Sequence, residues 1–431
     1  MRRSGLAALS FAIILSGCEG ARQDDALPVV SKNPDAPESP PTSATPTPPL
    51  VAAADKAKEP AKDAKPLKPS PGAPEFHAPD PSRPIRTFEQ IAALPNAEFD
   101  VAEAVLALGQ EATVSGDPQA ALKELDRLAA RARADLPDKP DAQDCFDTLY
   151  DLVLNRKSAD PFREDRAEDY DLTFTVSRRR GDCLSVGIMT LAVARRIGAP
   201  VWGAQCPAHF FLRSLPEADK NGKLAPINFD VTRLTPENWS RLDDEFYRRW
   251  QHFDEKAEAA GAYMRALTDR EVVSVFLSSR SGFYAGKKQH AQSLKDAQRS
   301  LELNPRNITA CINGGYAEEQ LGNLHAARDF YVQALKVDPN SVRALNNLAY
   351  VKVKDAAAPE FDPKGAEKLI DSALRIDPNK AYLHATYGEV KAAQKDWRGA
   401  TRALQDAMKL EPKNAAYRER MLALREQLRA Q

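Results

Sequence analysis

The chain has 431 residues, enough for two folded domains with extensions. Its 60 Lys and Arg residues nearly balance 61 Asp and Glu residues, so the strong positive field that gathers nucleic acid is excluded. With 43% hydrophobic residues the chain can fill packed cores, yet no run of about 20 apolar residues would span a membrane in the mature protein.

The first residues have the pattern of a secretory leader. Arg2 and Arg3 precede the short apolar stretch 6–15, and a Leu-Ser-Gly-Cys sequence ends at Cys18. This tetrapeptide resembles the bacterial lipobox, which implies cleavage before Cys18 and lipid attachment to it; an ordinary signal peptide with a chance cysteine is the alternative. We therefore expect residues 1–18 to be a lipoprotein signal peptide. The protein would be exported and lipid-anchored in the bacterial cell envelope, on its periplasmic or surface face.

The next segment, residues 19–86, has the composition of a tether. Of the chain's 32 prolines, 16 lie before residue 86, among Ala, Lys, Ser, Thr and Asp. Such a segment buries too little apolar surface to fold. As a flexible coil it would span about 50 Å, and as an extended polyproline helix about 200 Å. We expect it to hold a folded body away from the membrane.

Folded structure is expected from Thr87 onward, beginning with an α+β domain over residues 87–270. Apolar residues at helical spacing, and later short β-branched or aromatic runs bounded by Pro, Asn and Gly, predict helices followed by a small antiparallel sheet. The stretch 184–196 is apolar on most faces, which predicts a buried helix. The main predicted helices are 99–108, 120–128, 145–154, 172–178 and 184–196, and the predicted strands are 201–205, 208–213 and 227–232.

Residues 271–431 are periodic. One motif ends four times in a proline, at Pro305, Pro339, Pro378 and Pro412, with intervals of 34, 39 and 34 residues. A 34-residue period closed by proline resembles the tetratricopeptide repeat, an all-α solenoid with two helices per unit. The five extra residues fall in 355–363, a predicted loop. Small or aromatic residues are expected to lie between the paired helices, namely Ala327, Tyr331, Ala334, Gly388, Ala400 and Ala407. About four repeats and a capping helix over 414–428 are predicted.

A candidate nucleophile begins the buried helix. Cys183 follows Gly181 and Asp182, and the first turn of a helix favours a negative charge, as a thiolate needs. Asp182 would cap the helix. A base and an orienting acid are also needed. On paired antiparallel strands, His209 and Asp230 would be cross-strand neighbours facing the helix that carries Cys183.

Several segments together resemble the transglutaminase-like superfamily, which has a papain-like core. They are 179–187 (RRGDCLSVG), 192–198 (AVARRIG), 206–213 (CPAHFFLR) and 228–232 (NFDVT). The bacterial SirB-type group, whose members often carry tetratricopeptide repeats behind this core, is the most similar in pattern. The resemblance implies Cys183 as nucleophile, His209 as base and Asp230 as orienting acid. Many SirB-type members lack the cysteine, whereas this chain keeps all three residues.

Other polar residues give weaker signals. Gln205 is a candidate oxyanion donor, although it is equally a polar strand residue. Regular alternation places Cys206 on the sheet face opposite His209, unless Pro207 bends the strand, and a bridge to Cys183 is not expected. Core packing is the expected role of Trp202, Trp239 and Trp250, with a cleft wall as the alternative. No spacing of histidines or cysteines suggests a metal or a cofactor, so neither is predicted.

Two functions fit these patterns. The first is an envelope lipoprotein with a cysteine hydrolase or acyltransferase domain that acts on peptide-type amides and is guided by protein-binding repeats. The second is a non-enzymatic adaptor with a retired transglutaminase-like core. In both, we expect the repeat groove to bind a protein or peptide and lipid on Cys18 to anchor the protein to the membrane. Nucleic acid is not expected as a partner. A weaker third possibility is a structural envelope protein.

Overall fold

A computed structural model describes residues 76–77, 83–111, 116–153, 163–164, 170–215, 217–218, 224–231, 242–251, 253 and 255–429. The predicted leader with Cys18, and nearly all of the predicted tether, lie outside the described residues. Within the described ranges, no helix combines the length and apolarity needed to cross a bilayer.

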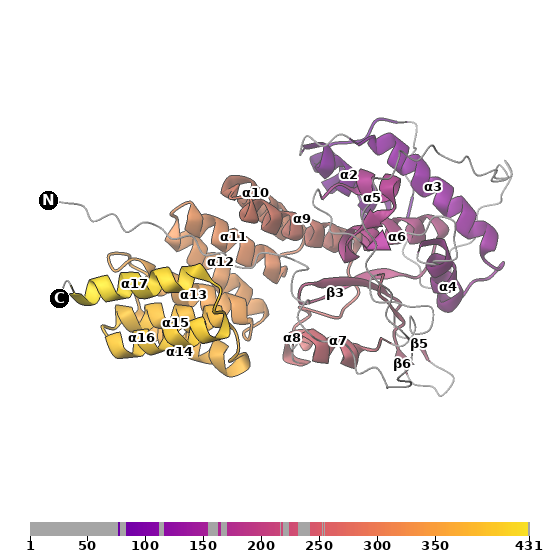
Figure 1. The fold of residues 1–431 in the computed structure, drawn as a ribbon. Helices are drawn as coiled ribbons and strands as arrows, with labels where there is room; N and C mark the ends of the chain where they lie inside the picture. Colours follow the sequence, from indigo (N-terminus) through magenta and orange to yellow (C-terminus); the bar gives the residue numbers. More distant parts are fainter. Residues whose placement is uncertain are drawn as a thin grey trace, which may run out of the picture.

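Helices come first in the chain and a small sheet follows, as the patterning predicts (Figure 1). The capping box formed by Thr87 and Gln90 begins the first helix. The N-terminal helices are α1 (Phe88–Ala92), η1 (Asn96–Glu98), α2 (Val101–Glu111), α3 (Pro118–Asp135), α4 (Ala142–Val153), α5 (Leu172–Arg178) and α6 (Cys183–Ile197).

The central sheet has three antiparallel strands in the order β3 (Trp202–Cys206), β4 (His209–Arg213) and β7 (Asn228–Phe229). Two-residue strands form two further pairs: β1 (Arg163–Glu164) with β2 (Arg180–Gly181), and β5 (Glu217–Ala218) with β6 (Leu224–Ala225). Helices α7 (Asp244–Gln251) and α8 (Glu255–Ala259) then follow.

Helix α6 lies at the centre of the domain, and every one of its residues is buried, as its unbroken apolar run predicts. Two adjacent arginines near its C-terminus fix it to its neighbours. Arg196 pairs with the fully buried Asp100 at 2.7 Å, and Arg195 pairs with Asp269 at 2.8 Å. Because a buried charge without a partner is costly, these pairs hold α6 in a defined position.

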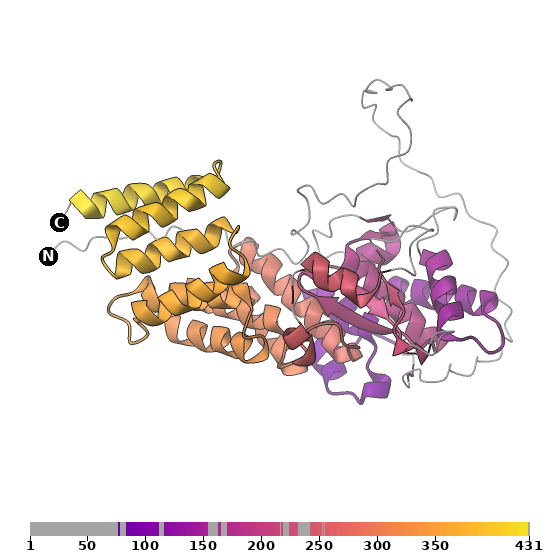
Figure 2. The same cartoon turned by 90° about the horizontal axis from the view of Figure 1, so that it is seen from below.

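Four helix pairs and a final helix make up the C-terminal part of the chain, within residues 269–429. Figures 1 and 2 show them extending away from the α+β domain. Their bounds are α9 (Asp269–Gly286), α10 (His290–Leu303), α11 (Ile308–Gln320), α12 (Leu324–Val337), α13 (Val342–Lys354), α14 (Pro363–Ile376), α15 (Ala381–Ala393), α16 (Trp397–Leu410) and α17 (Ala415–Arg429).

The residues predicted to separate the paired helices do so. Five of them are fully buried and Gly388 is buried as well. A Cβ atom on Gly388 would lie 3.1 Å from the Leu404 side chain, which explains the need for a small residue. The loop predicted over 355–363 separates α13 from α14.

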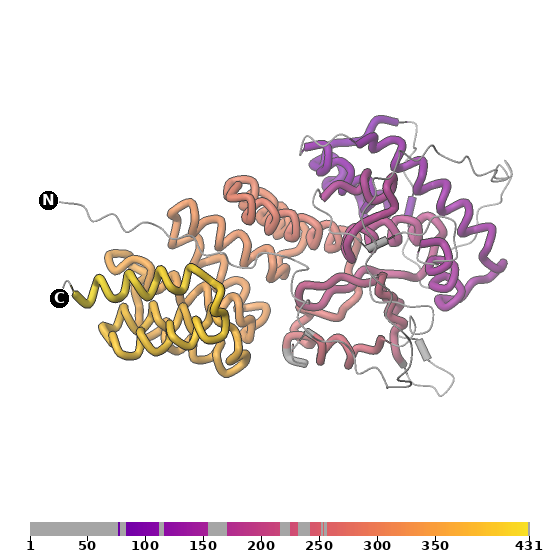
Figure 3. Tube along the Cα trace, viewed as in Figure 1, coloured from indigo at the N-terminus to yellow at the C-terminus, as the bar shows by residue number. Residues whose placement is uncertain are grey.

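Helix α9 is shared by the two parts of the protein. Its apolar residues Val272, Val273, Val275, Phe276 and Leu277 belong to the same core cluster as α2 and α6, while its partner in the first helix pair is α10. Arg280 of α9 donates to the carbonyl of Leu108 in α2 at 2.6 Å and pairs with Asp296 of α10 at 2.6 Å. The predicted boundary at residue 270 therefore falls at the start of a continuous helix, and the chain passes from core to repeats without a linker (Figure 3).

Candidate active site

Cys183 is the first residue of α6. Asp182 is the N-cap, and its carboxylate accepts a hydrogen bond from the Ser185 backbone N–H at 2.8 Å, while the Ser185 hydroxyl accepts from the Asp182 N–H at 3.0 Å. Gly181 leaves room for this box, because a Cβ atom there would lie 2.3 Å from the Ser185 hydroxyl. The Cys183 thiol thus sits at a helix N-terminus, where the free N–H groups and the dipole favour a thiolate.

A tight hairpin presents His209. Strands β3 and β4 are joined by Pro207 and Ala208 alone, and Ala208 has a φ of +57°. Cys206 is therefore directly opposite His209 in the ladder, on the same face of the sheet. The alternative left open in the sequence therefore holds: the chain turns at Pro207, the two residues lie on different strands, and regular alternation along one strand does not apply to them.

The other face of this hairpin packs against α6. The Phe210 ring lies between Gly187 of α6 and Gly203 of β3, and a Cβ atom on either glycine would come within 3.0 Å of that ring. Since side chains alternate along β4, His209 belongs to the opposite face, where its ring stacks with that of Phe211. The face that carries Phe210 therefore packs on the middle of α6. His209 instead reaches Cys183 from the first position of β4.

Asp230 follows directly after β7. The register pairs Leu212 with Phe229, so one further step would place Asp230 opposite Phe211 and diagonal to His209. The His209 Nε2 and Asp230 Oδ2 atoms are 2.6 Å apart, and Asp230 is fully buried. The Nε2 nitrogen of His209 is thus hydrogen-bonded to Asp230, so the other ring nitrogen, Nδ1, is the one available to the Cys183 thiol.

The electrostatics join all three residues. Burial lowers the pKa of His209, but the negative charges of the Asp230 carboxylate and the Cys183 thiolate, with hydrogen bonds to both groups, outweigh burial and raise the pKa to about 10. His209 therefore carries a proton at neutral pH. A protonated imidazole beside a thiol at a helix N-terminus stabilises a thiolate–imidazolium pair.

Helix α7 covers this site with two aromatic residues, Tyr247 and Trp250. Of these, Trp250 alone is expected from the sequence to have a packing or cleft role. The Tyr247 hydroxyl donates to Asp230 Oδ2 at 3.3 Å, and its ring stacks on Phe211 at 4.2 Å. Burial, and then the negative charge of Asp230, raise the pKa of Tyr247 well above its ordinary value. Trp250 meets the His209 ring edge-on at 5.0 Å. Their i, i+3 spacing, a helix-face signal, is the pattern that points to a shared role.

Polar contacts anchor α7 over the sheet. Arg213 of β4 pairs with Asp244 at 3.1 Å, and Asn228 of β7 donates to the same carboxylate at 2.9 Å. With α7 in place, Cys183 is 5% exposed and the His209 side chain 6%. The three candidate residues are therefore nearly closed off from solvent.

The remaining sequence candidates lie elsewhere or have other contacts. Gln205 donates to the carbonyl of Ala262 at 3.4 Å, and Trp202 is half-buried at the start of β3. Trp239 lies outside the described residues. Cys145, Cys183, Cys206 and Cys311 are all buried, reduced thiols. Within the described part of the chain, no three His, Cys, Asp or Glu side chains are grouped as metal ligands.

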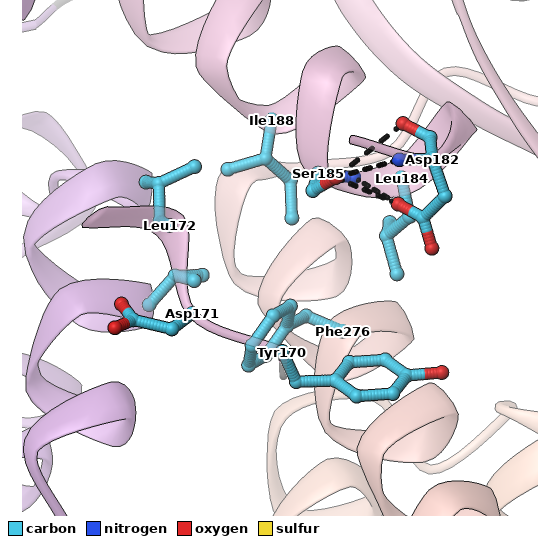
Figure 4. A pocket seen from close by; sticks show the side chains of 9 residues that line it. Tyr170, Asp171, Leu172, Asp182, Leu184, Ser185, Ile188 and Phe276 are labelled. Atoms are coloured by element: carbon cyan, nitrogen blue, oxygen red, sulfur yellow. Dashed lines mark hydrogen bonds between the residues drawn. The ribbon is translucent and has the colours of Figure 1, made fainter. Parts of the chain in front are cut away.

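A small pocket lies beside the start of α6 and does not include Cys183, His209 or Asp230 (Figure 4). Burial raises the pKa of the Asp182 carboxyl at its edge, against the hydrogen bonds from Ser185. The other lining residues are mostly apolar and come from α2, α6, α9 and the segment that leads into α5: Val105, Tyr170, Asp171, Leu172, Leu184, Ile188 and Phe276. The pocket therefore borders the capping box of α6 and contains none of the three candidate residues.

Comparisons with known proteins agree with this architecture. The model of the transglutaminase-like superfamily matches residues 119–277, which include all three candidate residues. A UPF0162 protein of Pseudomonas aeruginosa is 29% identical over 214 residues, covering 47% of this chain and 72% of that protein. An Hsp70-Hsp90 organizing protein of Triticum aestivum is 30% identical over 113 residues, covering 26% of this chain and 19% of that protein.

Among solved structures, a thermophilic TPR protein of Thermus thermophilus has a TM-score of 0.34 and 19% identity, covering 36% of this chain and 82% of that one. The tetratricopeptide-like arrangement of this chain rests on its own helix pairs, their 34-residue period and their buried small residues. The chain thus carries a transglutaminase-like superfamily domain, matched over residues 119–277, followed by tetratricopeptide-like helical repeats.

Proposed function

We propose that this transglutaminase-like domain is a cysteine hydrolase or acyltransferase acting on peptide-type amides. The observation that carries the proposal is the buried 2.6 Å contact between His209 and Asp230, beside Cys183 at the start of α6. A nucleophile, a base and an acid that orients the base are the groups that acyl transfer requires. The pKa of about 10 for His209 adds support, because it keeps a proton ready for the leaving group.

The reaction would take two steps. The Cys183 sulfur attacks the amide carbonyl carbon and forms a C–S bond, and the C–N bond then breaks as His209 gives its proton to the departing amine. Water, or a second amine, next attacks the thioester and returns a proton to His209, and the C–S bond breaks. Asp230 holds the imidazole and stabilises its positive charge throughout.

The test offers the full chain a mixture of glutamine-containing peptides together with a biotinylated primary amine. Mass spectrometry then separates three products: amine-coupled peptides indicate transfer, deamidated peptides indicate side-chain hydrolysis, and shortened peptides indicate backbone cleavage. We expect at least one product class, absent with Cys183→Ser and with His209→Ala. Product formation that survives Cys183→Ser would contradict the mechanism.

A second function is favoured by one specific observation, the near-complete burial of Cys183 and His209 under α7. A retired core would tolerate a covered site, and the chain would then act as an adaptor through its repeats. The relative named as an Hsp70-Hsp90 organizing protein supports a protein-binding role. In the same assay, an adaptor would form none of the three products and would still bind partner peptides.

We also propose that the protein works at the cell envelope, anchored by lipid on Cys18. The support is the order of charged, apolar and Leu-Ser-Gly-Cys segments at the start of the sequence. Metabolic labelling of producing bacteria with an alkyne fatty acid should tag the wild-type protein but not Cys18→Ser. Equal labelling of both would contradict the anchor.

A further inference from the structure

The first helices of the repeats form one continuous face. Within residues 269–429, α9 packs on α11, α11 on α13, and α13 on α15, whereas consecutive second helices are farther apart. Because the first helices lie closer together, they form the inner side of the solenoid's curve, the side on which repeat proteins bind extended partners. We call the surface of α11, α13, α15 and α17 the inner face.

Two cations of the inner face are paired with carboxylates of neighbouring first helices. Lys354 of α13 pairs with Glu319 of α11 at 3.0 Å. Arg420 of α17 lies 4.0 Å from Glu389 of α15. Each of these cations therefore has a carboxylate of its own.

Arg343 in the first turn of α13 is different. Its Nη2 atom is buried and has no hydrogen-bond partner among the described residues. Burial lowers its pKa, and the groups that oppose this effect are hydroxyls of Tyr382, Tyr263 and Tyr331, with no carboxylate among them. A buried guanidinium without an anion is costly, so its place between α13 and α15 needs an explanation beyond stability.

The surroundings of Arg343 reach the candidate active-site domain. Tyr263 packs against the cluster of repeat residues that contains Cys311 and Ala344. It also packs against the cluster that contains Cys206 and Tyr247, beside the His209 hairpin. A chain segment bound at Arg343 would therefore lie next to the side of the domain that carries α7.

We propose that Arg343 is the recognition site for an extended peptide, whose Asp or Glu side chain pairs with the guanidinium between α13 and α15. The inference deepens the proposed protein-binding role of the repeats and rests on it. Charge complementarity selects a carboxylate, because the buried Nη2 atom of Arg343 has no hydrogen-bond partner among residues 269–429 and no carboxylate is among the groups that act on this guanidinium. First helices lie on both sides of Arg343, so the peptide would continue in both directions, which favours an internal acidic residue over a chain terminus.

The test uses three libraries of decapeptides with randomised flanks. The first has blocked ends and a central glutamate, the second has blocked ends and a central glutamine, and the third has the glutamine and a free C-terminal carboxylate. Each library is incubated with the full chain carrying Cys183→Ala, so that turnover does not alter the peptides, and retained peptides are counted by mass spectrometry. We expect about tenfold or greater enrichment of the glutamate library over the glutamine library, as a charge-assisted hydrogen bond provides.

Variants of Arg343 decide the outcome. Arg343→Leu should abolish the preference for glutamate, Arg343→Lys should keep part of it, and Arg375→Leu, which changes an exposed arginine on the outer helix α14, should leave it unchanged. Without peptide, Arg343→Leu should raise the midpoint of thermal unfolding by about 2 °C or more, because it removes an unpartnered buried charge.

Equal retention of the glutamate and glutamine libraries, a preference that survives Arg343→Leu, or a strong loss of thermal stability in that variant would overturn the inference. Arg343-dependent enrichment of the free C-terminus alone would overturn the choice of an internal side chain. Retention of no library would overturn the peptide-binding role itself. None of these results depends on whether Cys183 is catalytic.

Discussion

Replacing Asp230 by asparagine tests the electrostatic core of the site. The substitution keeps the shape of the side chain but removes the charge 2.6 Å from His209 Nε2. In the variant, burial would still lower the pKa of His209, and Cys183 alone would remain to raise it. We expect the pKa to fall from about 10 toward the ordinary value of about 6.5. At about 1.4 kcal/mol per pKa unit, the lost interaction is up to about 5 kcal/mol.

The same change gives a signed prediction for stability. Because the folded-state pKa of His209 lies above the unfolded value, its stabilisation is complete below about pH 6.5 and is lost as the pH rises toward about 10. The difference in unfolding free energy between the wild type and Asp230→Asn should therefore be largest near pH 6 and shrink toward pH 10. Urea unfolding at several pH values measures it, and NMR titration of the His209 ring measures the pKa directly.

A matched control changes an exposed histidine–carboxylate pair. Asp329→Asn removes a carboxylate 3.6 Å from the His325 Nε2 atom, and the His325 and Asp329 side chains are 69% and 59% exposed. Since exposed pairs contribute little, this variant should show no comparable pH dependence. A His209 pKa that stays near 10 in Asp230→Asn would refute the assignment of the shift to Asp230.

Three further predictions concern the packing that holds the site. Tyr247→Phe removes the 3.3 Å hydrogen bond to the acid but keeps the stacked ring, and urea unfolding should show a loss of about 0.5–1 kcal/mol; no loss would mean that the hydroxyl contributes nothing. Gly187→Ala places a Cβ atom 2.6 Å from an aromatic ring and should cost about 1–3 kcal/mol, whereas Gly286→Ala, with open space around it, should be neutral or slightly stabilising. Arg280→Met leaves Asp296 buried without its cation and should cost about 3–5 kcal/mol in thermal unfolding; a neutral result would contradict the role of this pair in joining core and repeats.

The sequence predicts elements with strong periodicity well. The four-fold proline period predicts the helix pairs, and the apolar run after Cys183 predicts a buried helix that begins within one residue of the observed start. These signals are local, since each depends on residues within a few turns of one another.

Relations that depend on tertiary contacts could not be predicted in the same way. Applying the alternation of a single strand across Pro207 placed Cys206 on the face opposite His209, whereas the turn that begins at Pro207 brings the two residues onto the same face of the hairpin. The cover formed by Tyr247 and Trp250 depends on how α7 packs back over the sheet, through contacts between residues far apart in sequence such as Arg213 and Asp244. The unpartnered guanidinium of Arg343 appears only when all of its neighbours are known.

The central claim is that Cys183 and His209 form a thiolate–imidazolium pair at neutral pH. The far-ultraviolet absorbance of a thiolate reports this without requiring a reagent to enter the covered site. The measurement is the pH titration of the difference between the wild type and Cys183→Ser, with Cys311→Ser as a control, since burial raises the pKa of that thiol to about 12. We predict that the difference in thiolate absorbance between the wild type and Cys183→Ser is already present at pH 7 and disappears only in acid. A difference that emerges only near pH 8.5, the ordinary pKa of a thiol, would contradict the pair.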